Sequence, residues 1–162
     1  MLKQQTKLPV RLYARLSKDD GDADKESNSI TNQLQMLRYH AKEKGFEVIG
    51  EYVDDGISGT TFDRPDLNRM IKDAMKDTRP TGIMVKDMSR FGRNNAMFMY
   101  YVEEIFPNND ILFIALNDDV DTRFDENEMM PFKSIMNEYY ARDTSKKIRS
   151  VKKTMALNGG FC

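Results

Sequence analysis

The 162-residue sequence has one cysteine, one histidine and no tryptophan, and its apolar runs fall far short of the about 20 residues that span a membrane. One cysteine excludes an internal disulfide framework, and one cysteine with one histidine cannot form a structural zinc site. The only histidine, His40, lies inside a predicted helix and outside every motif, which argues against a serine–histidine–aspartate hydrolase. The first residues lack the apolar core of a secretory signal, so we expect a cytoplasmic protein without membrane association.

Length and composition predict one globular domain, since 40% of the residues are hydrophobic and 31% are charged. The net charge of −1 gives the whole molecule no general attraction to nucleic acid, but the charge is unevenly distributed. Residues 19–26 and 118–128 are acidic, whereas residues 142–153 form a basic stripe. Such a stripe is most often a solvated helix face, and contact with an acidic partner is the alternative. The stripe consists of Arg142, Lys146, Lys147, Arg149, Lys152 and Lys153.

Four apolar runs with strand character alternate with helical patterns, and they cover residues 10–16, 46–53, 82–86 and 111–116. This alternation predicts βαβ units and therefore an α/β fold with a mostly parallel central sheet flanked by helices.

Hydrophobic periodicity predicts the helices between these runs. The clearest one spans the periodic residues 30–41, where Ser29 or Asn28 can cap the start and Gly45 can end the helix. Two further helices are expected, one from Pro65 through residue 74 and one over residues 94–105, before Pro107.

A fourth and longer helix is expected near the C-terminal end of the sequence. No glycine or proline interrupts residues 132–157, which corresponds to a helix of ~40 Å. Its first half is rich in apolar side chains and its second half carries the basic stripe. We expect this helix to pack on the domain or on a partner, and to direct the stripe toward something acidic.

Arginine and serine side chains gather where the predicted parallel strands end. Because ligands bind beyond the carboxyl ends of parallel strands, three arginine-bearing loops are expected to converge on one hydroxyl group. Guanidinium groups stay charged and match the geometry of phosphate oxygens, so a phosphodiester fits this site best. The residues are Arg15 and Ser17 after the first run, Arg64 after the second, and Arg90 and Arg93 after the third.

Two neighbouring positions have local interpretations. Asp54 and Asp55 precede Gly56, and we interpret them as turn-forming residues. Arg64 precedes Pro65 at a predicted helix start, where a cation is unfavourable unless an anion lies nearby. The position of Arg64 therefore favours an anion at this end of the helix.

In this order, the segments resemble the catalytic domain of the serine recombinases, the resolvase and invertase family. The resemblance covers nearly the whole chain and is closest to the large serine recombinases of conjugative transposons. Ser89 stands where many small resolvases have an aspartate, and Ala141 stands where an acidic residue precedes the helix arginine. The matching segments are YARLS at 13–17, SNSITNQ at 27–33, residues 54–59, DRP at 63–65, SRFGR at 89–93, and Arg142.

The resemblance implies an enzyme that carries out site-specific DNA recombination without a cofactor or a metal. A serine would attack the scissile phosphodiester to give a 5′-phosphoseryl DNA intermediate, followed by strand exchange and religation during transposon excision or integration. The implied catalytic residues are the nucleophile Ser17 with Arg15, Arg64, Arg90, Arg93 and Gln33. The residues of the basic stripe are expected to bind DNA.

The resemblance also implies partners and a division of the chain. Double-stranded DNA and further copies of the chain are expected partners, as a dimer on each site and a tetramer in the synaptic complex. We expect a catalytic core at 1–128 and a helix for oligomerisation and DNA contact at 129–158. Residues 159–162 are expected to begin a linker to a further DNA-binding region, so that a chain of this extent is inactive alone.

Three other functions stay open on the residues alone. A noncatalytic DNA-binding or assembly module would need the basic stripe but not the arginines at the strand ends. A receiver-type signalling domain would need an aspartate where Arg15 and Ser17 stand. A metal-dependent nuclease could use Asp19, Asp20 or the run 118–121, although such acidic runs are more typical of solvated loops.

Overall fold

The computed structural model describes residues 7–16, 29–56, 64–92 and 95–123, together with positions 142, 145, 148, 149 and 153. The chain divides into two compact units, Met1–Arg123 and Phe124–Cys162. The predicted site residues Ser17 and Arg93 lie outside the described residues, as do Lys146, Lys147 and Lys152 of the basic stripe.

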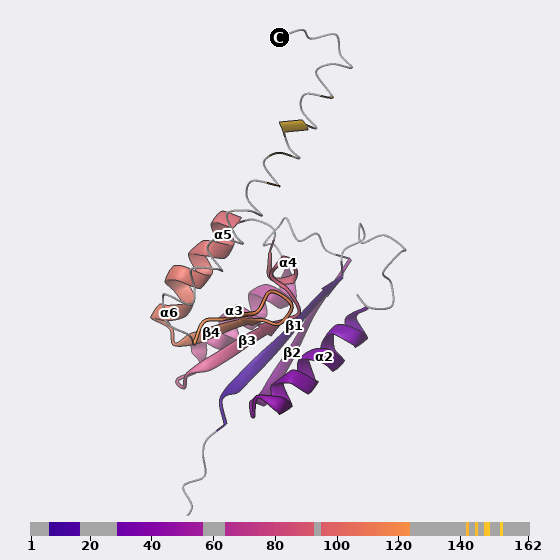
Figure 1. The fold of residues 1–162 in the computed structure, drawn as a ribbon. Coiled ribbons are helices and arrows are strands. Elements are labelled where there is room, and N and C mark those ends of the chain that lie inside the picture. The colour runs from indigo at the N-terminus through magenta and orange to yellow at the C-terminus, as the bar shows by residue number, and fades with distance from the viewer. Residues whose placement is uncertain are drawn as a thin grey trace, which may run out of the picture. The chain divides into compact units, whose positions relative to one another are not determined.

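A five-stranded sheet forms the centre of the first unit (Figure 1). Its strand order is β2-β1-β3-β4-β5, and all neighbouring pairs are parallel except β4 and β5. This architecture confirms the predicted α/β fold with a mostly parallel sheet. The short edge strand β5 was not predicted, because it lies in the acidic run and only the buried Val120 marks it. The strands are β1 (Pro9–Leu16), β2 (Glu47–Asp55), β3 (Thr81–Val85), β4 (Ile111–Ala115) and β5 (Val120–Asp121).

The first two predicted helices are confirmed as α2 (Ile30–Glu43) and α3 (Pro65–Lys76). The Ser29 hydroxyl caps α2 by accepting a hydrogen bond from the N–H of Asn32, and Gly45 follows the helix with a φ of +71°. The short α4 (Met88–Phe91) was not predicted, because four residues are too few to show helical periodicity.

The third predicted helix consists of three consecutive segments and runs further than expected. They are α5 (Asn95–Tyr100), the π-helical segment η2 (Tyr101–Ile105) and α6 (Phe106–Asn108). The expectation that the helix ends before Pro107 was wrong. Pro107 is the second residue of α6, and the π-helical segment directly before it changes the hydrogen-bond pattern of the helix next to this residue without an N–H group.

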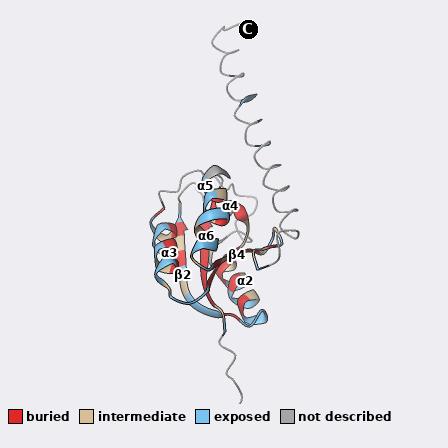
Figure 2. Cartoon of the chain, turned by 90° about the vertical axis from the view of Figure 1, so that its left-hand side faces the viewer, coloured by how far each residue is buried: buried red, intermediate tan, exposed pale blue. Residues whose placement is uncertain are grey.

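The alternation of side chains along β1 separates two faces of the sheet. Its even-numbered residues from Val10 to Ala14 pack in one core cluster with Leu34 and Leu37 of α2. Its odd-numbered residues from Arg11 to Arg15 contact α3, the residues that flank α3 at both ends, and α4. The sheet is therefore covered by α2 on one face and by α3 on the other, with the buried sides of both helices turned inward (Figure 2).

An aromatic cluster holds α4 against the sheet. Phe91, the last residue of α4, is wholly buried, and its ring meets the rings of Phe98, Phe106 and Phe113 edge-on at centroid distances of 5.5, 5.7 and 5.1 Å. Because Ser89 and Arg90 belong to the same short helix, this cluster fixes the segment that follows β3.

The described positions of the second unit, 142, 145, 148, 149 and 153, are all helical and exposed. They include Arg142, Arg149 and Lys153 of the basic stripe, and they agree with the long helix expected there. Within the described ranges, no helix has the length and apolar character needed to cross a membrane.

Candidate active site

The structure brings together Arg15, Arg64 and Arg90, three of the arginines predicted to converge. Arg15 Nη2 donates to the carbonyl oxygen of Ser89 at 3.2 Å, and Arg90 Nη1 donates to the carbonyl oxygen of Arg15 at 3.1 Å. Arg64 Nη1 donates to the Arg90 carbonyl oxygen at 2.9 Å, and its Nη2 donates to that of Phe91. These bonds join the end of β1, the start of α3 and the helix α4, as the rule for carboxyl ends of parallel strands predicts.

All three arginines are buried, with 0% of Arg15, 0% of Arg64 and 6% of Arg90 exposed. A buried guanidinium group is costly unless hydrogen-bond acceptors replace its water, and main-chain carbonyls serve as acceptors here. Burial lowers the pKa of Arg64, while Tyr13 and Asp54 act in the opposite direction. The site is therefore a compact group of cationic side chains embedded at one end of the sheet.

Gln33 holds the end of β1. Its side chain is buried, its Oε1 accepts from the N–H of Arg15 at 3.2 Å, and its Nε2 donates to the carbonyl oxygen of Arg15 at 3.1 Å. This two-point contact fixes the backbone that carries Arg15 and directly precedes the position of Ser17. The predicted catalytic role of Gln33 stays a prediction.

Asp54 is more than the turn-forming residue that we expected. Its Oδ1 accepts from the N–H of Asp66 at 3.1 Å, and its Oδ2 accepts from the N–H of Leu67 at 3.0 Å and from the Tyr13 hydroxyl at 3.0 Å. Asp54 thus caps α3 from the neighbouring strand, and it is an anion of the chain itself close to Arg64. The sequence contained one hint of this, because an arginine at the N-cap cannot accept the free N–H groups of the helix.

Asp87 is a second carboxylate that the sequence analysis missed. It caps α4 by accepting from the N–H of Arg90 at 3.2 Å, and it lies 3.7 Å from Arg90 Nε. The Ser89 hydroxyl also donates to Asp87. The segment that carries Ser89 in place of an aspartate therefore still has a carboxylate beside that hydroxyl.

Asp118 supports the same segment from the turn between β4 and β5. Its Oδ2 accepts from the N–H of Met88 at 2.6 Å. Burial raises the pKa of Asp118 and the nearby Asp87 raises it further, while the bond from Met88 lowers it. Three residues further along the chain, Asp121 pairs with Arg123. Asp118 and Asp121 of the run 118–121 thus have structural partners, whereas Asp19 and Asp20 lie outside the described residues. The described segments contain no group of three or more side chains suited to a metal ion.

We expect Asp118→Asn to make the stability of the domain less dependent on pH. A carboxyl group with a raised folded-state pKa contributes stability that is present below its unfolded pKa and lost as pH rises through its folded pKa. The asparagine oxygen can still accept from Met88 but has no charge to bury. We therefore expect the difference in free energy of unfolding, variant minus unsubstituted protein, to increase as the pH rises from 3 to 7.

Urea unfolding across this pH range measures the effect. Asp119→Asn is the matched control, because Asp119 is the exposed neighbour and its positive φ of 56° is one that asparagine tolerates. Identical pH profiles for Asp118→Asn and the unsubstituted protein would contradict the prediction.

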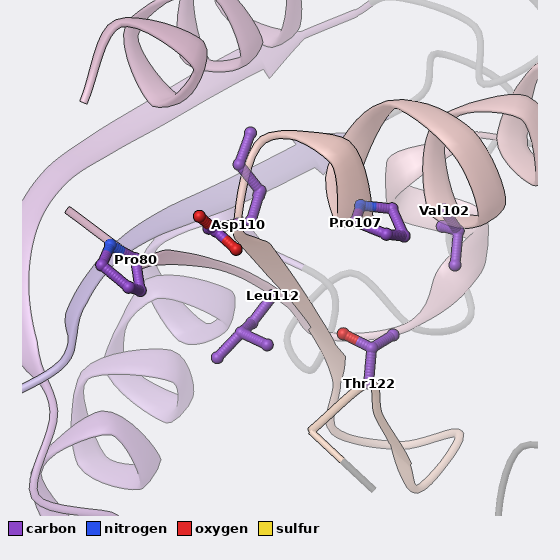
Figure 3. Close-up of a pocket in the computed structure, with 7 residues that line it drawn as sticks. Pro80, Val102, Pro107, Asp110, Leu112 and Thr122 are labelled. Carbon is purple, nitrogen blue, oxygen red and sulfur yellow. The ribbon is translucent and has the colours of Figure 1, made fainter. Parts of the chain in front are cut away.

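A pocket of about 220 Å³ lies at the other end of the sheet (Figure 3). Pro80 and Asp110, which directly precede β3 and β4, contribute to its lining together with Val102 and Pro107. None of the predicted site residues lines it. The pocket is therefore separate from the arginine cluster.

Comparison with known proteins gives a consistent assignment. The family model described as resolvase, N-terminal domain, matches residues 10–161. The N-terminal catalytic domain of TP901-1 integrase has a similar structure, with a TM-score of 0.66 and 28% identity over 83% of this chain and 97% of that one. No match was found among curated protein sequences.

Two further solved structures are similar. A resolvase family site-specific recombinase from Streptococcus pneumoniae has a TM-score of 0.64 and 25% identity over 95% of this chain and 99% of that one. The C-terminal catalytic domain of ISC1926 TnpA, an IS607-like serine recombinase, shares the fold at 21% identity and a TM-score of 0.57, over 94% of this chain and 95% of that one. With its parallel sheet and the family match over residues 10–161, the chain belongs to the resolvase family of serine recombinases.

Proposed function

We propose that this chain is the catalytic domain of a site-specific DNA recombinase of a mobile element, and that Ser17 is its nucleophile. The observation that carries the proposal is the convergence of Arg15, Arg64 and Arg90 at the carboxyl end of the sheet. Ser17 is the first residue after β1, which ends at Leu16 beside this cluster. The similar structures are themselves named an integrase and a site-specific recombinase, which supports the same reaction class.

In the proposed reaction, Ser17 Oγ attacks the phosphorus of the scissile phosphodiester and gives up its proton. The bond from phosphorus to the 3′ oxygen breaks, and that oxygen takes up a proton and leaves as a 3′-hydroxyl. The 5′ end is then joined to the serine as a phosphodiester, so its bond energy is retained. A 3′-hydroxyl from the exchanged strand attacks the phosphoserine, rejoins the DNA and restores the serine, and no nucleotide cofactor is needed.

The arginines would stabilise the charge that develops on the phosphate oxygens. Guanidinium groups suit this task because they remain charged and donate in a planar fork. In the described state, Arg15, Arg64 and Arg90 donate to main-chain carbonyls and are almost completely buried. Binding of the phosphate therefore requires that some of these carbonyl partners be exchanged for phosphate oxygens.

The basic stripe would bind the DNA backbone. Arg142, Arg149 and Lys153 are helical and exposed, as contacts with phosphate groups require. The helix at 129–158, which follows the predicted core at 1–128, would join copies of the chain. The copies would form a dimer on each site and a tetramer during strand exchange. These assemblies follow from the proposed double-strand cleavage of two sites.

The proposal is tested by looking for the covalent intermediate. The full-length protein is incubated with genomic DNA of its source in EDTA, and the reaction is stopped with detergent. After nuclease and protease digestion, mass spectrometry should find the Ser17 peptide carrying a 5′-phosphonucleoside. A nucleotide on a different residue would contradict the assignment of the nucleophile. Strand breaks that require a divalent metal and leave no adduct would favour a nuclease.

A further inference from the structure

The start of α3 has an unusual cap. The first N–H groups of a helix lack partners within the helix, and a polar N-cap side chain normally accepts from one of them. The N-cap of α3 is Arg64, whose side chain is only a donor and makes no capping bond. Arg64 also places a positive charge at the positive end of the helix dipole. Something else must therefore satisfy this helix end and offset its charge.

Asp54 does both from the end of β2. Its carboxylate is 3% exposed and accepts from the N–H groups of Asp66 and Leu67 at 3.1 and 3.0 Å. The reverse contact also exists, because the Asp66 carboxylate accepts from the N–H of Val53 at 2.9 Å. Asp54 of β2 thus accepts from α3, and Asp66 of α3 accepts from β2. Because Arg64 directly precedes α3, these bonds fix its backbone.

Tyr13 completes the arrangement from β1. Its hydroxyl donates to Asp54 Oδ2 at 3.0 Å, and the guanidinium carbon of Arg64 lies 5.6 Å from its ring centroid. Burial raises the pKa of Tyr13, with Asp54 raising it further and Arg64 opposing, so the hydroxyl stays protonated and remains a donor. Tyr13 therefore contacts both Asp54 and Arg64, the two charged side chains at this helix end.

We infer that Asp54 and Tyr13 are positioning residues for Arg64, which hold its guanidinium group in the catalytic cluster beside Arg15 and Arg90. The inference rests on the proposed function, because it assigns the pair a role in the reaction at Ser17. Asp54 supplies the helix cap and the counter-charge, and Tyr13 orients that carboxylate and packs its ring under the guanidinium group. Neither residue has to touch DNA.

The expected effect is a slower reaction with normal DNA binding. Tyr13→Phe removes the hydroxyl that orients Asp54, and Asp54→Asn keeps a capping oxygen but removes the counter-charge. Because small displacements of a catalytic group have large kinetic effects, each change should slow formation of the Ser17 adduct by roughly 10–100-fold. DNA affinity should change little, since the basic stripe is untouched.

The chain contains a close match for Tyr13 that serves as a control. Tyr52 lies beside Tyr13 in the parallel register of β1 and β2, and its hydroxyl donates to Asp73 of α3 at 3.0 Å. The guanidinium carbon of Arg69 lies 4.8 Å from its ring centroid. Tyr52→Phe therefore removes an equivalent bond between sheet and helix without involving Arg64. It should lower the unfolding midpoint about as Tyr13→Phe does and leave the adduct rate unchanged.

Two measurements test the inference on the full-length protein. The first is the adduct rate at saturating DNA, with the DNA that yields the Ser17 adduct. The second is solvent exchange of the Arg64 Nε–H group by NMR, with the signal assigned by its loss in Arg64→Lys. Tyr13→Phe and Asp54→Asn should slow the adduct and speed this exchange, whereas Tyr52→Phe should do neither.

The inference is overturned if Tyr52→Phe slows the adduct as much as Tyr13→Phe, because the effect would then follow stability alone. It is also overturned if neither Tyr13→Phe nor Asp54→Asn changes the Arg64 exchange. If the unsubstituted protein forms no Ser17 adduct, the proposed function fails. The exchange measurement then still decides whether the pair positions Arg64.

Discussion

Replacing Ser17 with alanine is expected to abolish the covalent protein–DNA complex and to leave DNA binding intact. Alanine has no side-chain oxygen that could attack phosphorus, and the proposed reaction uses no cofactor that could supply another nucleophile. The basic stripe, whose described members Arg142, Arg149 and Lys153 are exposed, is unchanged by this substitution. Detergent-resistant complexes on a denaturing gel measure the adduct, and a mobility shift under native conditions measures binding.

This variant also separates the competing functions. A noncatalytic DNA-binding module would give the same result with and without Ser17 in both assays, and a metal-dependent nuclease would lose its strand breaks in chelator. Ser89 is the matched comparison, because its hydroxyl lies beside Asp87 in the arginine-bearing helix α4. An adduct that survives in Ser17→Ala and disappears in Ser89→Ala would assign the nucleophile to Ser89.

The fold was predictable because each main strand has a local signature. The runs predicted at 10–16, 82–86 and 111–116 agree with β1, β3 and β4 to within one residue at each end, since apolar side chains stop where each strand leaves the core. The elements that were missed lack such a signature. The two residues of β5 depend on pairing with β4, and the single turn of α4 depends on capping by Asp87 and on packing of Phe91.

The arginine cluster was predictable and its supports were not. The rule that parallel strands end at one edge of a sheet brings Arg15, Arg64 and Arg90 together without any knowledge of side-chain contacts. The role of Asp54 depends instead on Tyr13, which is 41 positions away, and on the first turn of α3. An interpretation of Asp54 from its neighbours in the sequence could therefore predict only the turn that follows it.

These supports change the meaning of Arg64 at a helix start. The sequence favours an anion there, and the structure places the carboxylate of Asp54 at that helix end. The arginine is therefore balanced before any DNA arrives. Its buried guanidinium group donates to the carbonyls of Arg90 and Phe91, so the cluster is assembled within the domain. A phosphate would therefore enter a site where the arginines already lie together, and binding would exchange some of their carbonyl partners for phosphate oxygens.

Phe91→Ala is expected to cause the largest loss of stability of any single substitution proposed for this domain. The Phe91 side chain is wholly buried and meets four aromatic rings edge-on, including that of Phe113 on β4 at 5.1 Å. Truncating a buried phenylalanine typically costs about 3–5 kcal/mol, because the surrounding side chains fill the cavity only in part. Phe91→Leu should cost clearly less, since it keeps most of the volume. Urea unfolding of the three proteins measures both losses.

The same substitution tests whether the aromatic cluster supports the site as well as the fold. The carbonyl oxygens of Arg90 and Phe91 accept from Arg64, so loosening the end of α4 should expose the Arg64 guanidinium group and speed exchange of its Nε–H. Phe46→Ala is the control, because Phe46 is buried in the cluster on the α2 face of the sheet. It should lower the free energy of unfolding without changing the Arg64 exchange under native conditions. Equal exchange in Phe91→Ala and Phe46→Ala would show that the aromatic cluster stabilises the fold without fixing the arginines, and that the Asp54 cap suffices to hold Arg64.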